Sequence, residues 1–157
     1  MENKIVNISI EVFKAIEEKV GKEDKNFYEN LYKEAHDWNA FITSSGLINT
    51  LLFGFNRAVN NEDTQKGKIS PESVLSAVAL EILSKDLEEF SVKEVNLNLS
   101  LLSERWKDFI GLLTEISQLE KGLEKQIIFQ EFLTHFSRLA KVKAFALNGR
   151  ENSGNEG

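Results

Sequence analysis

The sequence of 157 residues contains no cysteine, one proline, one methionine and only two histidines. The absence of cysteine excludes disulfide bonds, thiolate metal sites and cysteine nucleophiles, and it is typical of proteins from a reducing compartment. A single proline leaves long stretches that can be helical without interruption. The first residues, Met1–Ile5, are too polar for the start of a signal peptide. We therefore expect a cytoplasmic protein.

Long hydrophobic runs are also missing, so we expect no membrane span. The longest stretch that is poor in charge covers residues 38–61, where Arg57 is the only charged residue, but this stretch contains many amide and hydroxyl side chains. Hydrophobic residues make up 41% of the chain and charged residues 28%, which is the balance of a globular domain. The length fits a single domain with a sizeable core.

A basic excess is absent as well, because the net charge is −6. Free-standing nucleic-acid-binding proteins are usually basic, so this charge argues against that class. The charge is unevenly spread, however. Residues 73–104 hold six acidic residues against two lysines, whereas residues 121–150 hold six lysines or arginines against two glutamates. The C-terminal part could therefore contact a phosphate backbone locally.

Apolar residues recur at helical spacing throughout the chain. Ile8, Val12, Ile16 and Val20 recur every fourth residue, and Gly21 can end the helix that they define. The same spacing predicts further helices over residues 25–44, 47–60, 102–116 and 124–147. A helix that begins at Ser70-Pro71 is predicted from local chemistry, since serine caps helix starts and proline fits the first turn.

The segment of residues 84–100 has no clear periodicity. Residues 96–100 alternate like a strand, but one short strand would have no partner in this chain. We favour irregular chain or a short helix opened by Ser91, with Glu94 completing a capping box. Residues 61–69, which precede the helix that begins at Ser70-Pro71, are mostly polar and are expected to form a loop.

These patterns predict an all-α fold. We expect a compact bundle of about five to seven helices, formed by a single helical domain over residues 1–148. The last helix should end at Asn148-Gly149, because glycine and asparagine often end helices. Residues 149–157 contain no apolar side chain and are expected to be a disordered tail.

The helix over residues 47–60 has two dissimilar faces when its residues are placed at 100° per step. One face consists of apolar residues, namely Leu47, Leu51, Leu52, Phe55 and Ala58. The opposite face carries amide, hydroxyl, aromatic and guanidinium groups, namely Asn49, Thr50, Phe53, Asn56 and Arg57. A solvated helix face normally carries lysine and glutamate. This face therefore either belongs to a helix that is buried on all sides or docks another chain.

The last predicted helix also has an unusual outer face. Its inward stripe is apolar and consists of Ile128, Phe129, Phe132, Leu133, Phe136, Leu139 and Ala140. Its outward side mixes cations with polar and apolar groups, namely Arg138, Lys141, Gln130, Thr134, Ile127 and Phe145. Lys143 falls within the inward stripe and is expected to extend its ammonium toward solvent. These cations either complement the helix dipole or contact a partner or a nucleic-acid strand.

Catalytic motifs are absent. His36 and His135 are the only histidines, and neither lies three residues after a glutamate, as the pairs of helical di-iron sites require. Residues 67–70 resemble the end of a phosphate-binding loop, but the position that requires glycine is Glu62. We expect both histidines at helix surfaces and expect no enzymatic activity, no metal or other cofactor and no small-molecule substrate.

Residues 41–53, FITSSGLINTLLF, combine a helix end, a short Ser-Gly-Leu turn and a new helix that continues with Thr-Leu-Leu-Phe. In these residues the chain resembles the small α-helical subunit of the Cmr complex, the type III-B CRISPR RNA-targeting complex, in which this subunit is the fifth Cmr protein. Residues 130–140 are similar to the C-terminal helix of the same family. The likeness in helix order covers most of residues 5–147.

The resemblance implies a non-catalytic subunit that stacks in several copies, contacts other Cmr proteins and helps bind the crRNA-guided target RNA in antiviral defence. The cations that we expect to contact RNA are Arg57, Arg138 and Lys141. The residues that we expect at subunit interfaces are Asn49, Phe53, Asn56 and Phe145. Two other functions remain open: a helical protein–protein adaptor or homo-oligomer without a nucleic-acid role, and a bundle whose phenylalanines line a small-molecule site.

Overall fold

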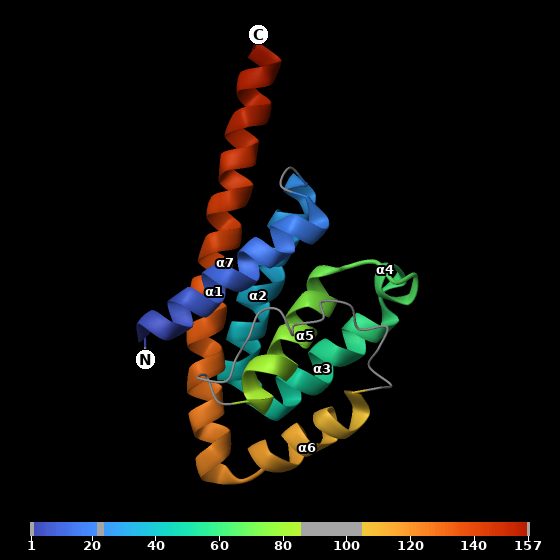
Figure 1. Ribbon diagram of the computed structural model, residues 1–157, viewed down its shortest axis with the longest axis vertical. Coiled ribbons are helices and arrows are strands. Elements are labelled where there is room, and N and C mark those ends of the chain that lie inside the picture. The colour runs from blue at the N-terminus through green and yellow to red at the C-terminus, as the bar shows by residue number, and fades with distance from the viewer. Residues whose placement is uncertain (1, 22–23, 86–104, 157) are drawn as a thin grey trace.

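The computed structural model describes residues 2–21, 24–85 and 105–156, and every regular element in these ranges is a helix (Figure 1). The helices are α1 (Glu2–Val20), α2 (Lys25–Ser45), α3 (Leu47–Asn60), α4 (Glu62–Gln65), α5 (Pro71–Ser84), α6 (Trp106–Ile116) and α7 (Leu119–Glu156). The all-α prediction is confirmed. Within the described ranges, no helix is long and apolar enough to cross a membrane.

Helix α5 is the most deeply buried element of the bundle. All its residues from Ser73 to Leu83 are buried, because α2, α3, α6 and α7 pack against it. The predicted cap at Ser70 is present: the Ser70 hydroxyl accepts a hydrogen bond from the Ser73 amide at 3.1 Å, and Pro71 occupies the first turn. This cap satisfies backbone groups that would otherwise be buried without partners.

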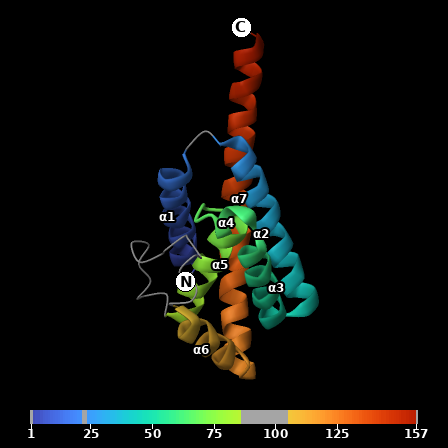
Figure 2. The same ribbon diagram turned by 90° about the vertical axis from the view of Figure 1, so that its right-hand side faces the viewer.

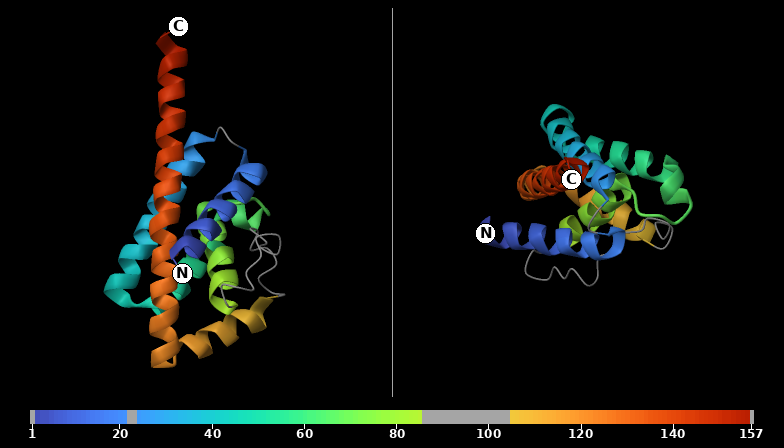
Figure 3. Two further views of the ribbon diagram at one scale, coloured as in Figure 1. Left: turned by 60° about the vertical axis from the view of Figure 1, so that its left-hand side comes forward. Right: turned by 90° about the horizontal axis from the view of Figure 1, so that it is seen from above.

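Helices α2 and α7 form the long axis of the molecule (Figure 2). They run antiparallel, since Asn39 of α2 bonds to Thr134 of α7 while Thr43 bonds to Gln130. The inner side of α7 contributes three fully buried rings, Phe129, Phe132 and Phe136. Helix α1 crosses α7 on another side and contributes to the same hydrophobic core (Figure 3).

Two predicted glycine stops are confirmed. Gly21 follows α1 with a φ of 100°, and Gly46 separates α2 from α3 with a φ of 88°. Residues with a side chain rarely adopt a positive φ, so glycine suits both turns. The Gly46 amide still donates to the Ile42 carbonyl at 2.8 Å, and α3 begins at the next residue.

Some boundaries differ from the predicted ones. The expected loop after α3 contains the short helix α4, which the Asn61 side chain caps by accepting hydrogen bonds from two backbone amides. Helix α7 begins at Leu119 and keeps helical backbone to Glu156, so the predicted end at Asn148-Gly149 is wrong. Gly149 has no positive φ and no proline follows, so nothing breaks the backbone there. The last part of α7 extends beyond the bundle as a terminal tail (Figure 1).

Several predictions lie outside the described residues. These are the possible capping box of Ser91 and Glu94, the alternating residues 96–100, and the predicted start of a helix at residue 102. The described part of that last helix is α6, which begins at Trp106 and packs against α5 and α7.

Candidate interaction surfaces

Helix α3 presents an aromatic and amide surface to solvent. Phe53 is 49% exposed, and its ring stacks on Phe41 of α2 with centroids 5.1 Å apart. Asn49 and Asn56 are also exposed, and they lie one turn before and one turn after Phe53. The structure therefore brings these three predicted interface residues onto one side of α3.

Arg57 lies on the same side, but other side chains compensate its charge. Its guanidinium is 5.7 Å from the centroid of the Phe53 ring. Its Nη1 atom lies 2.6 Å from Glu34 Oε1, and its Nη2 atom lies 3.5 Å from Glu72 Oε1. A phosphate could bind Arg57 only by competing with these two carboxylates. In this structure Arg57 is a structural cation, unlike the free cation expected at an RNA contact.

Glu34 is the buried anchor of this cluster. Its side chain lies between α2 and α3, where Oε1 also accepts a hydrogen bond from Trp38 Nε1 at 3.0 Å. Burial raises the pKa of the Glu34 carboxyl, because it removes water from the charged form. The Trp38 hydrogen bond and the Arg57 charge act in the opposite direction. The cluster connects the surface of α3 to the core residue Trp38.

Two positions on α3 contradict the predicted faces. Thr50, expected on the polar outer face, is buried, and Leu52, expected to face inward, is 46% exposed. The reason is that α3 packs against both α2 and α5, which turns the buried sector toward Thr50 and Gly54. The Thr50 hydroxyl is satisfied by donating to the Gly46 carbonyl at 2.8 Å. The interpretation that α3 is buried on all sides is wrong, because Phe53 and Leu52 are half exposed.

The C-terminal half of α7 carries exposed cations and apolar groups together. Arg138 is exposed and has no ion-pair partner in the part of the chain that the structure describes. The Lys141 ammonium lies 5.4 Å from the centroid of the Tyr32 ring on α2. Phe145 is 78% exposed and Val142 is 67% exposed. Arg138, Lys141 and Phe145 therefore form one basic and apolar surface.

Lys143, two residues from Lys141, has a different environment. Its ammonium lies 2.9 Å from Glu17 Oε2 on α1 and 5.6 Å from the centroid of the Tyr28 ring. Burial, helped by Glu17 and Asp24, raises the pKa of Tyr28 to about 12. The Tyr28 hydroxyl donates to the Gly21 carbonyl at 2.6 Å. The prediction that Lys143 extends to solvent is wrong, because its ammonium links α7 to α1.

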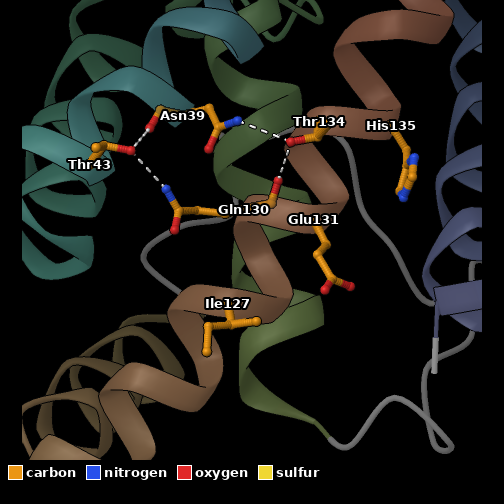
Figure 4. A pocket seen from close by; sticks show the side chains of 7 residues that line it. All are labelled: Asn39, Thr43, Ile127, Gln130, Glu131, Thr134 and His135. Carbon is orange, nitrogen blue, oxygen red and sulfur yellow. Dashed lines mark hydrogen bonds between the residues drawn. The ribbon is translucent and has the colours of Figure 1, made fainter.

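A polar groove lies between α2 and α7 (Figure 4). Asn39 Nδ2 donates to Thr134 Oγ1 at 3.1 Å, and Gln130 Nε2 donates to Thr43 Oγ1 at 3.1 Å, so amide and hydroxyl groups join the two helices across the groove. The other lining side chains come from α7 and are Ile127, Glu131 and His135. The groove is therefore neutral along its α2 wall and carries its ionisable groups on α7.

The two histidines lie on different helices. His36 is exposed on α2, with its ring 6.0 Å from that of Tyr32, and His135 is half-buried at the α2–α7 groove. Among the described residues, no group of three or more histidine, aspartate or glutamate side chains is arranged to hold a metal ion.

Comparisons with known proteins identify no relative. No protein-family model, no curated protein and no solved structure matches the chain. The fold class therefore rests on the structure alone, and the resemblance of residues 41–53 to the Cmr small subunit stays a prediction.

Proposed function

We propose that this chain is a non-catalytic small subunit of a type III-B CRISPR (Cmr) ribonucleoprotein effector complex, where it stacks in several copies and helps bind the target RNA. The observation that supports this function best is the exposed surface of Arg138, Lys141 and Phe145 on α7. It combines two cations with an aromatic ring, and Arg138 has no carboxylate partner in the described chain. The resemblance at residues 41–53 supports the choice of complex.

The chemistry of this surface fits a phosphate backbone. An arginine that is not already paired can donate two parallel hydrogen bonds to a phosphate, and a lysine adds a second charge nearby. Phe145, which is 78% exposed, adds aromatic surface on which a base can stack. An isolated chain of net charge −6 would bind RNA weakly. Copies aligned along one strand would each add a few phosphate contacts, so the array would bind more tightly than the single chain.

The surface of α3 supports the assembly part of the proposal. Phe53 projects half exposed between Asn49 and Asn56, with no lysine or glutamate among these positions. An aromatic side chain surrounded by neutral amides is typical of the centre of a protein interface. Arg57 belongs to this surface through its contact with Phe53, and we assign it to assembly more readily than to RNA binding.

The test is reconstitution of a Cmr complex with this chain as its small subunit, followed by measurement of target-RNA affinity at several salt concentrations. The variant Arg138→Glu with Lys141→Glu should still assemble but should bind RNA more weakly. Its affinity should also depend less on salt, by roughly one unit of slope for each phosphate that the variant no longer neutralises. The control, Lys14→Glu with Lys33→Glu, changes the net charge equally at exposed positions of α1 and α2. Equal RNA binding by both double variants would contradict the RNA role.

One observation favours a second function. Leu119, Leu123 and Ile127 on the first part of α7 are 77%, 52% and 59% exposed. Exposed apolar side chains in such a row are typical of protein–protein contacts. The alternative is therefore a helical adaptor or homo-oligomer without a nucleic-acid role. Failure of the chain to enter the Cmr complex, with its fold intact, would favour this alternative.

A further inference from the structure

The side of α7 that faces away from α5 has a symmetric arrangement of side chains. We call it the outer face of α7. It consists of six residues: Glu124, Ile127, Glu131, Arg138, Val142 and Phe145. Successive members are three, four, seven, four and three residues apart, so the spacing reads the same in both directions along the helix. Side chains three, four or seven residues apart share one side of a helix.

The charges on this face are separated along the helix. Its first half carries the acids Glu124 and Glu131, and its second half carries Arg138. Glu131 and Arg138 have no ion-pair partner among the described residues. The nearby cation Lys125 is directed elsewhere, since it contacts Glu115. The outer face therefore has an acidic half and a basic half, with apolar side chains in both.

The outer face is open to solvent. Helices α1 and α2 lie on either side of α7 and leave this side uncovered (Figures 1 and 3). Ile127, Val142 and Phe145 are 59%, 67% and 78% exposed. At the middle of the face, the groove between α2 and α7 forms a hollow of about 500 Å³ beside Thr134 (Figure 4). This hollow leaves room for side chains of another helix.

We infer that the outer face of α7 binds the same face of a second copy of this chain, with the two α7 helices antiparallel about a two-fold axis near Thr134. The mirrored spacing then places Glu131 of each copy against Arg138 of the other, and Ile127 of each copy against Val142 of the other. Such a self-complementary contact closes as a dimer. This inference goes beyond the proposed function and does not rest on it. It concerns the free chain, because the pair covers Arg138 and Phe145 and closes them to RNA until the two copies separate.

Charge complementarity selects this arrangement over its alternative. A parallel pair would place Glu131 against Glu131 and Arg138 against Arg138, and like charges across an interface are strongly unfavourable. The antiparallel pair instead makes two opposite-charge contacts, which fix the register, while the contacts of Ile127 with Val142 remove hydrophobic surface from water. Phe145 of each copy lies opposite Glu124 of the other. The two kinds of contact thus require the same register.

The experiment measures the mass of the full chain by sedimentation equilibrium over a concentration series. The wild type should form a dimer. Glu131→Arg and Arg138→Glu should each weaken dimerisation by roughly tenfold or more, because each places two pairs of like charges in contact. The double variant should restore the dimer, and so should an equimolar mixture of the two single variants, since both combinations recreate opposite charges. Circular dichroism checks that each variant keeps its helical content.

The matched controls are Glu18→Arg and Lys33→Glu, which place the same charges at exposed positions of α1 and α2. They should leave the dimer unchanged. A wild type that stays monomeric over the whole series, or single variants that dimerise as the controls do, would overturn the inference. A monomer that binds single-stranded RNA through Arg138 would also overturn it while leaving the proposed function intact. Conversely, a dimer with the expected charge exchange, in a chain that never enters the Cmr complex, would support pairing and reject the proposed function.

Discussion

The Arg57 surface on α3 and the Arg138 surface on α7 each combine an arginine with an exposed phenylalanine, yet they are built differently. Beneath Arg57 lies a buried carboxylate, Glu34, which is itself held by Trp38 of the core. Arg138 has no described ion-pair partner, and its neighbour Lys141 only lies over an aromatic ring.

The difference shows which cation can bind an external ligand. A buried carboxylate is stable when charged only if a counter-ion stays beside it, so Glu34 holds Arg57 in place. An arginine in this position maintains the fold, and the exposed Phe53 ring lies against its guanidinium. Arg138 does not pair with a described carboxylate, so its hydrogen-bond donors can bind a phosphate or a carboxylate of another chain. Similar residue types thus serve different roles because of what lies beneath them.

The largest effect is expected where the α3 surface meets the core. A Cβ atom added at Gly54 would lie 2.1 Å from an atom of the buried Trp38 ring. Gly54→Ala should therefore lower the free energy of unfolding by about 2–3 kcal/mol, because neither helix can move apart without losing packing. Gly111→Ala on α6 is the control: nothing lies within 4 Å of its added Cβ, and it should stabilise the chain by about 0.5–1 kcal/mol. Urea unfolding measures both changes, and equal effects would contradict the tight contact of α3 with Trp38.

A smaller effect, and one that depends on pH, is expected from Arg57→Ala. At neutral pH it leaves the buried Glu34 without its nearest counter-charge, which should cost about 1–2 kcal/mol, below the ~3–5 kcal/mol of fully buried pairs because Arg57 is partly exposed. The pKa of Glu34 is raised in the folded state, so its protonated form is favoured there and stability is lost as pH rises through the folded pKa. Removing Arg57 raises that pKa further.

The difference between wild type and Arg57→Ala should therefore be largest at neutral pH. It should shrink as pH falls toward 4.5, the ordinary value for the Glu34 carboxyl, because a protonated carboxyl needs no counter-ion. Urea unfolding at a series of pH values measures the difference. Arg138→Ala is the comparison variant, whose small effect should not change over this range. A pH-independent difference for Arg57→Ala would show that Glu34 is not the group that Arg57 stabilises.

The features that sequence predicted best depend on neighbouring residues. The bounds of α3, the cap at Ser70 and the stop at Gly46 each follow from residues within one or two helical turns. The role of Arg57 could not be predicted in this way, because its partners Glu34 and Glu72 come from two other helices. These contacts exist only once α2, α3 and α5 are packed together.

The candidate surfaces could be predicted only in part, because spacing along one helix does not show how the other helices pack against it. Helical spacing correctly placed Phe53, Asn49 and Asn56 on one side of α3, and Arg138 on the outer side of α7. Spacing alone placed Thr50 outward, because it assumes that a helix is covered from one direction, whereas α3 is covered by two helices. It also left the pairing of Lys143 with Glu17 unseen, since 126 residues separate them in sequence.

The smallest effect is expected at the free cation of α7. At concentrations where the chain is monomeric, Arg138→Ala should change the free energy of unfolding by less than about 0.5 kcal/mol, because an exposed side chain without a described partner contributes little to folding. Lys143→Ala, five residues further along the same helix, should cost about 0.5–1 kcal/mol because it removes the Glu17 ion pair and the contact with Tyr28. Thermal or urea unfolding of the two variants tests whether the contribution of a cation to stability depends on its position along α7 or on the side chains that it contacts. If Arg138→Ala destabilises the chain as much as Lys143→Ala does, Arg138 stabilises the fold as Arg57 does. The proposed difference between the two arginine surfaces would then be wrong.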